Sequence, residues 1–433
     1  MAASKGPQTA SDGSPKGPHT RPDGSPKGPH TGSDGSPKGP LDGLIVLDLS
    51  RILAGPTCTQ VLGDMGATII KIEHPERGDD TRTWGPPFAM GDDGQPTDLS
   101  SYFMSTNRNK LSVAVDISTP EGQAIIRQIA ARADIVIENF KPGGLDKYQL
   151  DHGTILNAHP SLIYCSISGY GQTGPNRNKP GYDLMAQGYS GIMSLTGEAD
   201  GAPVKVAVGI ADVVTGMYAA VGILAALHHR TQTGQGQHID LSLVDTSLAW
   251  MINEGVAHLT TGKPRQRRGN QHATIVPYQT FACADGFVLV AVGNNLQYTR
   301  FCDFLGRPDL ATDPRFATNP ARLEHRDTLI PILEALMAAQ SQADIVSGLE
   351  VRKVPVGPVH TVEQAFASDQ AQAREMRIDL PKAGINRGGV ELIGNPLKFS
   401  ATPVTYRHAP PHLGEDTQAV LNWLDGKTQT PDS

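Results

Sequence analysis

The chain has 433 residues, enough for two or three domains of ordinary size. Its 37 Lys and Arg residues are outnumbered by 44 Asp and Glu residues, which gives a formal net charge of −7. This acidic balance excludes most nucleic-acid-binding proteins and argues against an anionic membrane surface as a partner. Hydrophobic residues make up 38% of the chain, and we find no unbroken apolar run of the ~20 residues that a membrane span needs.

The four cysteines are Cys58, Cys165, Cys283 and Cys302. They lie far apart in apolar surroundings and form no CxxC motif, so neither a disulfide framework nor a zinc cluster is expected. We therefore predict buried thiols, no metal site and a reducing, cytoplasmic location.

Residues 1–40 form an 11-residue repeat in which Asp-Gly-Ser-Pro-Lys-Gly-Pro recurs three times. Because this segment holds few apolar residues, it cannot bury enough surface to offset its ordering entropy, and we predict disorder. It has neither the apolar core of a signal peptide nor the Arg-rich pattern of a transit peptide. A binding tail is the alternative interpretation.

From residue 41 onward, short apolar runs alternate with amphipathic stretches. Predicted strands cover residues 44–49, 67–72, 135–137 and 162–167. Predicted helices cover residues 55–65 and 120–133, the second opened by Thr119 as N-cap. Strand and helix in this alternation predict an α/β fold with a doubly wound parallel sheet.

The turn after the first predicted strand is where a dinucleotide-binding protein carries its glycine-rich motif. Residues 49–56 contain one glycine, whereas the dinucleotide fingerprint needs three for close approach to a pyrophosphate. A P-loop is also absent from the sequence. The pattern therefore disfavours a nicotinamide or nucleoside triphosphate enzyme.

The second half begins with a strong predicted helix from Val213 to Arg230. A strand at 238–243 and a helix at 244–259 follow. The basic, turn-rich residues 262–268 mark a boundary. We therefore divide the ordered chain into a large domain, a small α/β domain with strands at 278–283 and 287–292, and a returning segment; these are residues 41–262, 263–360 and 361–433.

Three stretches carry residue types that packing alone does not explain. Residues 71–88 are rich in charge after a strand, and residues 168–175 are rich in glycine after another. Asp212 follows an apolar run with small neighbours and is placed at the N-cap of the long helix. Each also has a purely structural interpretation. Residues 71–88 would be a solvated charged loop, residues 168–175 an ordinary loop, and Asp212 a structural helix cap.

Five motifs in this chain resemble the class III coenzyme A transferases, the family of formyl-CoA transferase and carnitine CoA-transferase. They are RILAGP at 51–56, GATIIKIE at 66–73, NRNKLSV at 107–113, ENFKPG at 138–143 and LGEDT at 413–417. The resemblance extends from Leu41 to about Leu424. Residues 79–88 and 274–279 are most similar to the succinyl-CoA–glutarate branch.

The resemblance implies a Rossmann-like large domain, a smaller α/β domain and an interlaced ring homodimer. It also implies that Asp212 is the catalytic nucleophile, which forms an anhydride and then an aspartyl-CoA thioester. A helix N-terminus would keep this carboxylate ionised. Coenzyme A thioesters are then substrates, and no cofactor is permanently bound. The family's glycine-rich covering loop corresponds to residues 269–274, which are not glycine-rich here.

Two sets of binding residues follow from the resemblance. The coenzyme A contacts that it implies are Ile52, Leu53, Ala54, His74, Arg77, Val115, Asn139, Phe140, Lys141, Lys147 and Tyr182. A dicarboxylate needs a cation for its far carboxylate, and the candidates are Arg51, Arg82 and Arg108.

Two other functions stay open at this point. An α-methylacyl-CoA racemase would need a histidine where this chain has Tyr182, and a phenol is a poor base at neutral pH. The second is a non-catalytic CoA-binding protein, which would leave Asp212 without a role. The acceptor acid is also open: glutarate, another short dicarboxylate or a sulfinate analogue.

Overall fold

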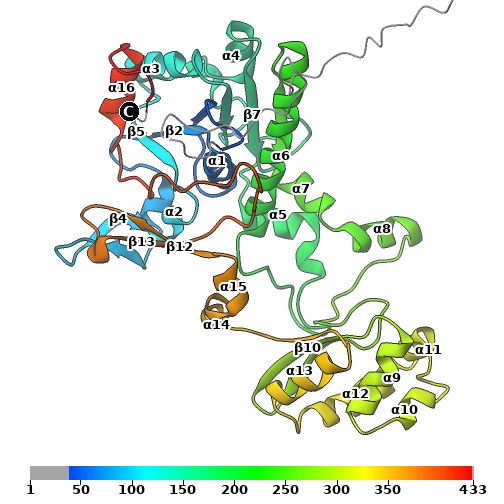
Figure 1. Cartoon of the computed structure of the whole chain (residues 1–433). Coiled ribbons are helices and arrows are strands. Elements are labelled where there is room, and N and C mark those ends of the chain that lie inside the picture. Colours follow the sequence, from blue (N-terminus) through cyan, green and yellow to red (C-terminus); the bar gives the residue numbers. More distant parts are fainter. Residues whose placement is uncertain (1–38, 432–433) are drawn as a thin grey trace, which may run out of the picture.

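In the computed structural model, which describes residues 39–431, six parallel strands form one central sheet (Figure 1). The prediction of a disordered tail falls almost entirely outside the described residues. The strands are β1 (Ile45–Asp48), β2 (Thr68–Glu73), β5 (Lys110–Ala114), β6 (Ile135–Glu138), β7 (Ile163–Ser168) and β8 (His238–Ser242). Their spatial order is β5-β2-β1-β6-β7-β8, so the predicted α/β fold with a large parallel sheet is confirmed.

Helices cover both faces of this sheet. The long helix α6 (Ile210–Thr233) and α1 (Ala54–Asp64) pack on one face, and α3 (Pro120–Ala130), α4 (His152–Ala158) and α16 (Thr417–Leu424) on the other. Successive residues of β1 alternate between the two cores: Val46 faces α1, and Leu47 faces the opposite side. Strands buried on both sides explain the continuous apolar runs in the sequence.

Between β2 and β5 the chain leaves the sheet and forms a small hairpin layer. It comprises η1 (Asp80–Thr83), β3 (Phe88–Met90), β4 (Pro96–Ser100) and α2 (Ser101–Met104). The C-terminal strands β12 (Arg377–Pro381) and β13 (Gly389–Ile393) pack against this layer and share its core. The C-terminal segment therefore lies on the large domain, as Figure 1 shows.

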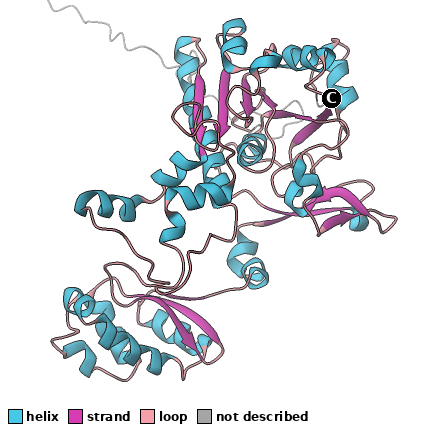
Figure 2. Cartoon of the chain, turned by 180° about the vertical axis from the view of Figure 1, so that it is seen from behind, coloured by secondary structure: helices cyan, strands magenta, loops and turns pink. Residues whose placement is uncertain are grey.

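The small domain contains a separate three-stranded antiparallel sheet and five helices, which share their own core. Extended segments connect it to the large domain (Figure 2). Its strands are β9 (Tyr278–Cys283), β10 (Gly286–Ala291) and β11 (Val356–Pro358). Its helices are α9 (Asn295–Phe304), α10 (Asp309–Thr312), α11 (Asn319–Glu324), α12 (Arg326–Met337) and α13 (Gln342–Val351). Helices α14 (Val362–Ala367) and α15 (Asp369–Ala373) lie on the way back to the large domain.

One predicted helix, residues 244–259, is in fact two. Helix α7 (Leu243–Ala249) ends, and α8 (Ile252–Thr261) starts after a break at which Ile252 has a φ of 33°. No glycine or proline marks this break, so the pattern alone did not show it. Helix α8 buries none of its side chains.

Of the helices within residues 39–431, α6 has the length and the apolar composition that a membrane-spanning helix needs. The bent pair α12 and α13 would count as a second candidate if it were one span. In the structure, 44% of the apolar window of α6 is buried, and the helix packs against α1, α7 and the sheet.

Candidate active site

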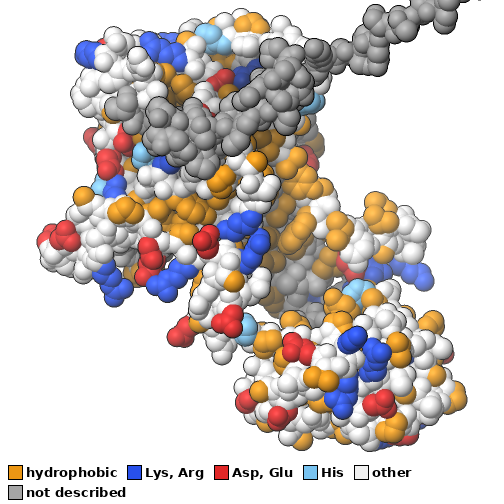
Figure 3. Space-filling model, viewed as in Figure 1, with side chains coloured by type: hydrophobic (Ala, Val, Ile, Leu, Met, Phe, Trp, Pro, Cys, Tyr) orange, Lys and Arg blue, Asp and Glu red, His pale blue; other side chains and the backbone are white. Residues whose placement is uncertain are grey.

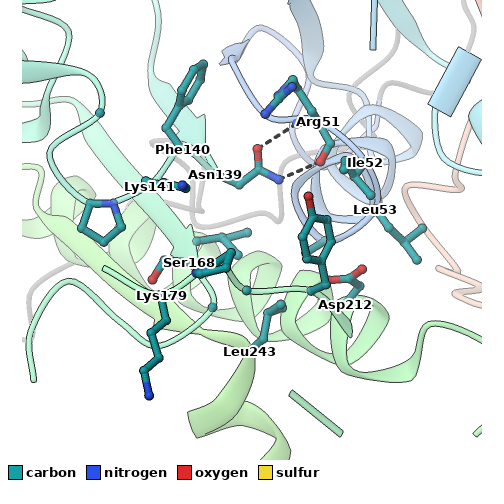
Figure 4. A pocket seen from close by; sticks show the side chains of 18 residues that line it. Arg51, Ile52, Leu53, Asn139, Phe140, Lys141, Ser168, Lys179, Asp212 and Leu243 are labelled. Atoms are coloured by element: carbon teal, nitrogen blue, oxygen red, sulfur yellow. Dashed lines mark hydrogen bonds between the residues drawn. The ribbon is translucent and has the colours of Figure 1, made fainter. Parts of the chain in front are cut away.

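A cavity of about 390 Å³ lies where the order of the sheet reverses, between β1 and β6 (Figure 4). In doubly wound sheets, ligands bind outside the carboxyl ends of the strands at this switch point. The walls come from the segments after β1, β6, β7 and β8, and from the first turn of α6. The cavity is lined by Arg51, Ile52, Leu53, Ala54, Asn139, Phe140, Lys141, Pro142, Gly144, Ile167, Ser168, Gly169, Lys179, Pro180, Gly181, Tyr182, Asp212 and Leu243.

The Asn139 side chain joins the two loops at the switch point. Its Oδ1 accepts from the Arg51 backbone N–H at 2.9 Å, and its Nδ2 donates to the Arg51 carbonyl at 2.7 Å (Figure 4). Gly55 is required beside this turn, because a Cβ there would lie 2.2 Å from the Ser50 Oγ. The turn that opens α1 is therefore held by Asn139 from the loop after β6.

Asp212 is the third residue of α6, because the helix begins at Ile210. Its predicted place at the N-cap is therefore wrong. The free N–H groups of this helix start have another acceptor: Asp183 Oδ1 accepts from the Ala211 N–H at 2.8 Å and lies 3.5 Å from the Asp212 nitrogen. The Asp212 side chain therefore does not cap the helix. It lines the cavity instead and is 8% exposed.

The surroundings of Asp212 also differ from those expected at a helix N-terminus. Burial, and then the neighbouring carboxylate of Asp183, raise the pKa of Asp212 to about 7. The helix N-terminus was expected to keep this group ionised, but desolvation and a like charge oppose ionisation. A buried carboxyl with so raised a pKa in a cavity is typical of functional sites.

A second cavity, of about 290 Å³, adjoins the first along the same edge of the sheet. It lies outside β2 and β5, and Arg51 and Phe140 line both cavities. The Arg51 guanidinium lies 5.8 Å from the centre of the Phe140 ring. Arg77 brings a cationic side chain to the second cavity, and His74 brings an imidazole. Together the two cavities can hold one extended ligand with an anionic end.

The structure distributes the predicted coenzyme A contacts over these two cavities. The first holds Ile52, Leu53, Ala54, Asn139, Phe140, Lys141 and Tyr182, and the second holds His74, Arg77, Val115 and again Phe140. Lys147 lines neither: its Nζ lies 4.6 Å from the ring centre of Tyr148, which does line the second cavity.

Two of the three candidate arginines for a substrate carboxylate are structural. Arg82 is buried, and its guanidinium binds Glu73 at 2.7 Å and Asp98 at 2.7 Å. Arg108 is also buried and forms two hydrogen bonds with Asp64, at 2.9 and 2.5 Å. The predictions for these two residues are therefore corrected, because both point into the protein. Arg51 lines the cavity.

Sequence reasoning did not assign several residues that the structure brings to the site. Asp183 lies beside Asp212, and Lys179 and Leu243 line the cavity. Burial, followed by the carboxylates of Asp212 and Asp183, raises the pKa of Tyr102, which places this phenol near Asp212. Only Asp183 had a sequence signal, namely its place after the glycine-rich stretch.

The stretch expected to correspond to a covering loop, residues 269–274, lines neither cavity of its own chain. Arg326 of the small domain holds it, donating to Gln271 Oε1 at 2.9 Å and to the His272 carbonyl at 2.7 Å.

The cysteines and possible metal ligands lie elsewhere. Cys58, Cys165 and Cys302 are buried, whereas Cys283 is partly exposed, contrary to the prediction for all four. Within residues 39–431, no three His, Cys, Asp or Glu side chains cluster closely enough to hold a metal ion.

The fold and the cavity define an α/β protein with a buried carboxyl group in a ligand site at the switch point. The chain belongs to CoA-transferase family III, whose model matches residues 41–417. It is 45% identical, over 90% of its length and 98% of the relative's, to succinate–glutarate CoA-transferase from Agrobacterium fabrum (strain C58 / ATCC 33970).

Two further relatives agree. The chain is 38% identical to succinyl-CoA:glutarate CoA-transferase from Homo sapiens, over 88% of this chain and 85% of that one. The crystal structure of a CAIB/BAIF family protein from Brucella suis matches with a TM-score of 0.81 and 44% identity, covering 90% of this chain and all of that one. The protein is therefore an enzyme that transfers coenzyme A between acids.

Proposed function

We propose that this enzyme moves coenzyme A from succinyl-CoA to a short dicarboxylate, with Asp212 as the nucleophile. The observation that carries the proposal is the buried Asp212 carboxyl in the switch-point cavity. The names of the relatives from Agrobacterium fabrum and Homo sapiens support the two acids.

The proposed chemistry conserves the thioester energy in four transfers. The Asp212 carboxylate attacks the thioester carbonyl, giving a mixed anhydride and the CoA thiolate. The thiolate attacks the aspartyl carbonyl, which forms aspartyl-CoA and releases succinate. The acceptor carboxylate then displaces the thiolate, and the thiolate attacks the acceptor's acyl carbonyl, which restores Asp212. Burial of the Asp212 carboxyl limits the access of water to the anhydride.

The two cavities suggest how coenzyme A lies. Its phosphates would face His74 and Arg77 in the second cavity. The pantetheine arm would pass Arg51 and Phe140, which line both cavities, and bring the sulfur to Asp212. This arrangement uses the loops after β1, β2 and β6, which meet at one edge of the sheet.

Arg51 is the proposed cation for the far carboxylate of the acid. It is half exposed in the cavity wall and pairs with Asp80 at 2.7 Å, in an ion pair that water screens. A bidentate carboxylate can compete for such a guanidinium. Lys179 also lines the cavity, but its side chain extends away from Asp212 in Figure 4.

Racemase chemistry is the second candidate, and Tyr182 argues against it. The side chain at this position lines the cavity near Asp212, yet it is a phenol rather than an imidazole. Because a phenol stays protonated at neutral pH, it cannot take a proton from an α-carbon efficiently.

We also propose that the chain works as a homodimer, interlaced as the family resemblance implies. Apolar side chains gather over the side of the large domain where α6 lies (Figure 3). An apolar patch of this extent is typical of an interface. The exposed apolar side chains of α6, α7 and α8 and of the turn between the last two are Met217, Tyr218, Val221, Leu224, Leu248, Trp250, Ile252, Val256 and Leu259.

A panel of acids tests the substrate proposal. Succinyl-CoA is offered with glutarate, other dicarboxylates, sulfinates and monocarboxylates of equal length, and new thioesters are read by mass spectrometry. We expect dicarboxylates to react best, and Arg51→Ala to raise KM for them about tenfold or more while changing monocarboxylates little. Lys179→Ala is the matched control, and selectivity lost in it instead would assign the far carboxylate to Lys179.

A further inference from the structure

The turn that carries Arg51 and Ile52 into the cavity has an unfavourable backbone. Ile52 has a φ of 73°, in the left-handed region that β-branched residues avoid. Such a conformation persists only where the surroundings impose it, and it commonly occurs at ligand sites. The contacts that impose it here are therefore of functional interest.

A buried lysine holds the start of this turn. Lys71 projects from β2, is 0% exposed, and its Nζ donates to the Ser50 carbonyl at 2.9 Å. The same Nζ donates to Asp79 Oδ2 at 2.9 Å. Burial opposes the charge on Lys71, but the carboxylates of Asp79, Asp48 and Glu73 outweigh it and raise its pKa.

The partner carboxylate holds the other end of the turn. Both oxygens of Asp79 lie 3.2 Å from the Ile52 nitrogen and accept from its N–H. Asp79 is itself fixed, because its Oδ1 accepts from the Thr81 N–H and hydroxyl at 3.0 and 2.8 Å. One ion pair thus binds the backbone on both sides of Arg51.

We propose that the Lys71–Asp79 ion pair is a positioning device for coenzyme A: it imposes the left-handed turn at Ile52 and so presents residues 51–54 to the ligand. The inference rests on the proposed function, since it takes this wall as the coenzyme A site. Neither side chain lines the first cavity. Both border the second cavity, but their side chains are 0% exposed and their charged atoms bond to the turn and to each other, so they act through the turn. Asn139, in the loop after β6, also binds the turn through the backbone N–H and carbonyl of Arg51.

The test compares two buried ion pairs. Lys71→Met combined with Asp79→Asn removes both charges together, which avoids leaving one charge buried and unpaired. Arg108→Met combined with Asp64→Asn does the same to a pair that is also buried but does not touch the turn. Binding of free coenzyme A is measured by calorimetry on full-length proteins, and melting curves confirm that each is folded.

We expect the first double variant to bind coenzyme A at least about tenfold more weakly, because small displacements of a binding loop are costly. Its KM for succinyl-CoA rises more than its kcat falls, and the second double variant binds as wild type does. Should the first double variant not fold, Asp79→Asn alone is measured against Asp64→Asn.

Unchanged affinity in the Lys71 and Asp79 variants would overturn the positioning role. Equal losses in both double variants would overturn it too, because charge loss anywhere in the core would then suffice. Failure of the wild-type protein to bind coenzyme A is a distinct result, and it would overturn the proposed function together with this inference.

Discussion

At the scale of single residues, the proposed role of Asp212 places two conflicting demands on its carboxyl group. A carboxylate that attacks a thioester must be ionised, yet a site that protects an anhydride must exclude water. Burial and Asp183 raise the pKa of Asp212 to about 7, so both forms are populated near neutral pH. A raised pKa also makes the ionised carboxylate a stronger nucleophile than an ordinary aspartate.

The pH dependence of kcat/KM for succinyl-CoA follows from this pKa. Because only the carboxylate attacks, the rate falls about tenfold per pH unit below pH 7 and levels off above it. Asp183→Asn removes a like charge, so the break moves to lower pH, although burial keeps it above the ordinary value of 3.8. A profile that is flat from pH 5 to pH 8, or a break that stays in place in Asp183→Asn, would contradict this account.

At the scale of elements, the packing of α1 against α6 brings Ala54 and Asp212 into the same cavity wall. Gly216 of α6 faces the first turn of α1: a Cβ there would lie 2.5 Å from the Ala54 carbonyl oxygen and 2.9 Å from the Thr57 Cβ. The two helices can therefore approach only with glycine at this position. Ala54 lines the cavity, so their spacing also sets its width.

Two glycines of α6 give a matched comparison. Gly216→Ala is expected to lower the free energy of unfolding by about 1–3 kcal/mol through overpacking and to raise KM for succinyl-CoA. A Cβ at Gly222 would contact the Ile239 methyl groups at 3.5 and 3.7 Å, an ordinary van der Waals distance. Gly222→Ala is therefore expected to raise the free energy of unfolding by up to about 1 kcal/mol, because alanine has the higher helix propensity. Denaturant unfolding measures both, and a stabilised Gly216→Ala would show that the contact is not tight.

The comparison of predicted and observed elements shows which features a local sequence pattern can predict. Apolar runs located β1, β2, β6 and β7 because strands buried on both faces leave a continuous signal. Strand β5 was not predicted, because Lys110 and Ser112 interrupt its apolar run. The start of α6 was misplaced because its N–H groups bond to Asp183, 28 residues away. Likewise, Arg108 looked like a free cation because its buried partner Asp64 lies 44 residues away. Arg82 pairs with Glu73 and Asp98, which lie 9 and 16 residues away on either side of it. Long-range pairing is invisible to local pattern.

At the scale of the whole molecule, α6 leaves one apolar side uncovered in a single chain. Val221 is 63% exposed and Tyr218 is 46% exposed, on a helix whose other side is core. Two connections join the small domain to the large one, and the second of them carries the short helices α14 and α15 (Figure 1). Both features fit a chain that wraps around a second copy.

An interlaced dimer predicts a mass that does not change on dilution. Light scattering from nanomolar to micromolar concentration should give twice the 46.0 kDa of one chain throughout, since threaded rings separate only by unfolding. Val221→Glu would then place a charge in the interface and abolish soluble dimer. An active monomer at any concentration, or a Val221→Glu protein that behaves as wild type, would contradict the assembly.

The central claim is that Asp212 carries coenzyme A during turnover, and mass spectrometry of the enzyme itself tests it most directly. The protein is incubated with succinyl-CoA, quenched in acid and digested. The peptide that contains Asp212 is expected to gain the mass of coenzyme A less water, with no gain in Asp212→Asn and retained gain in Lys179→Ala. Steady turnover without this adduct, or an adduct on another residue, would contradict the mechanism.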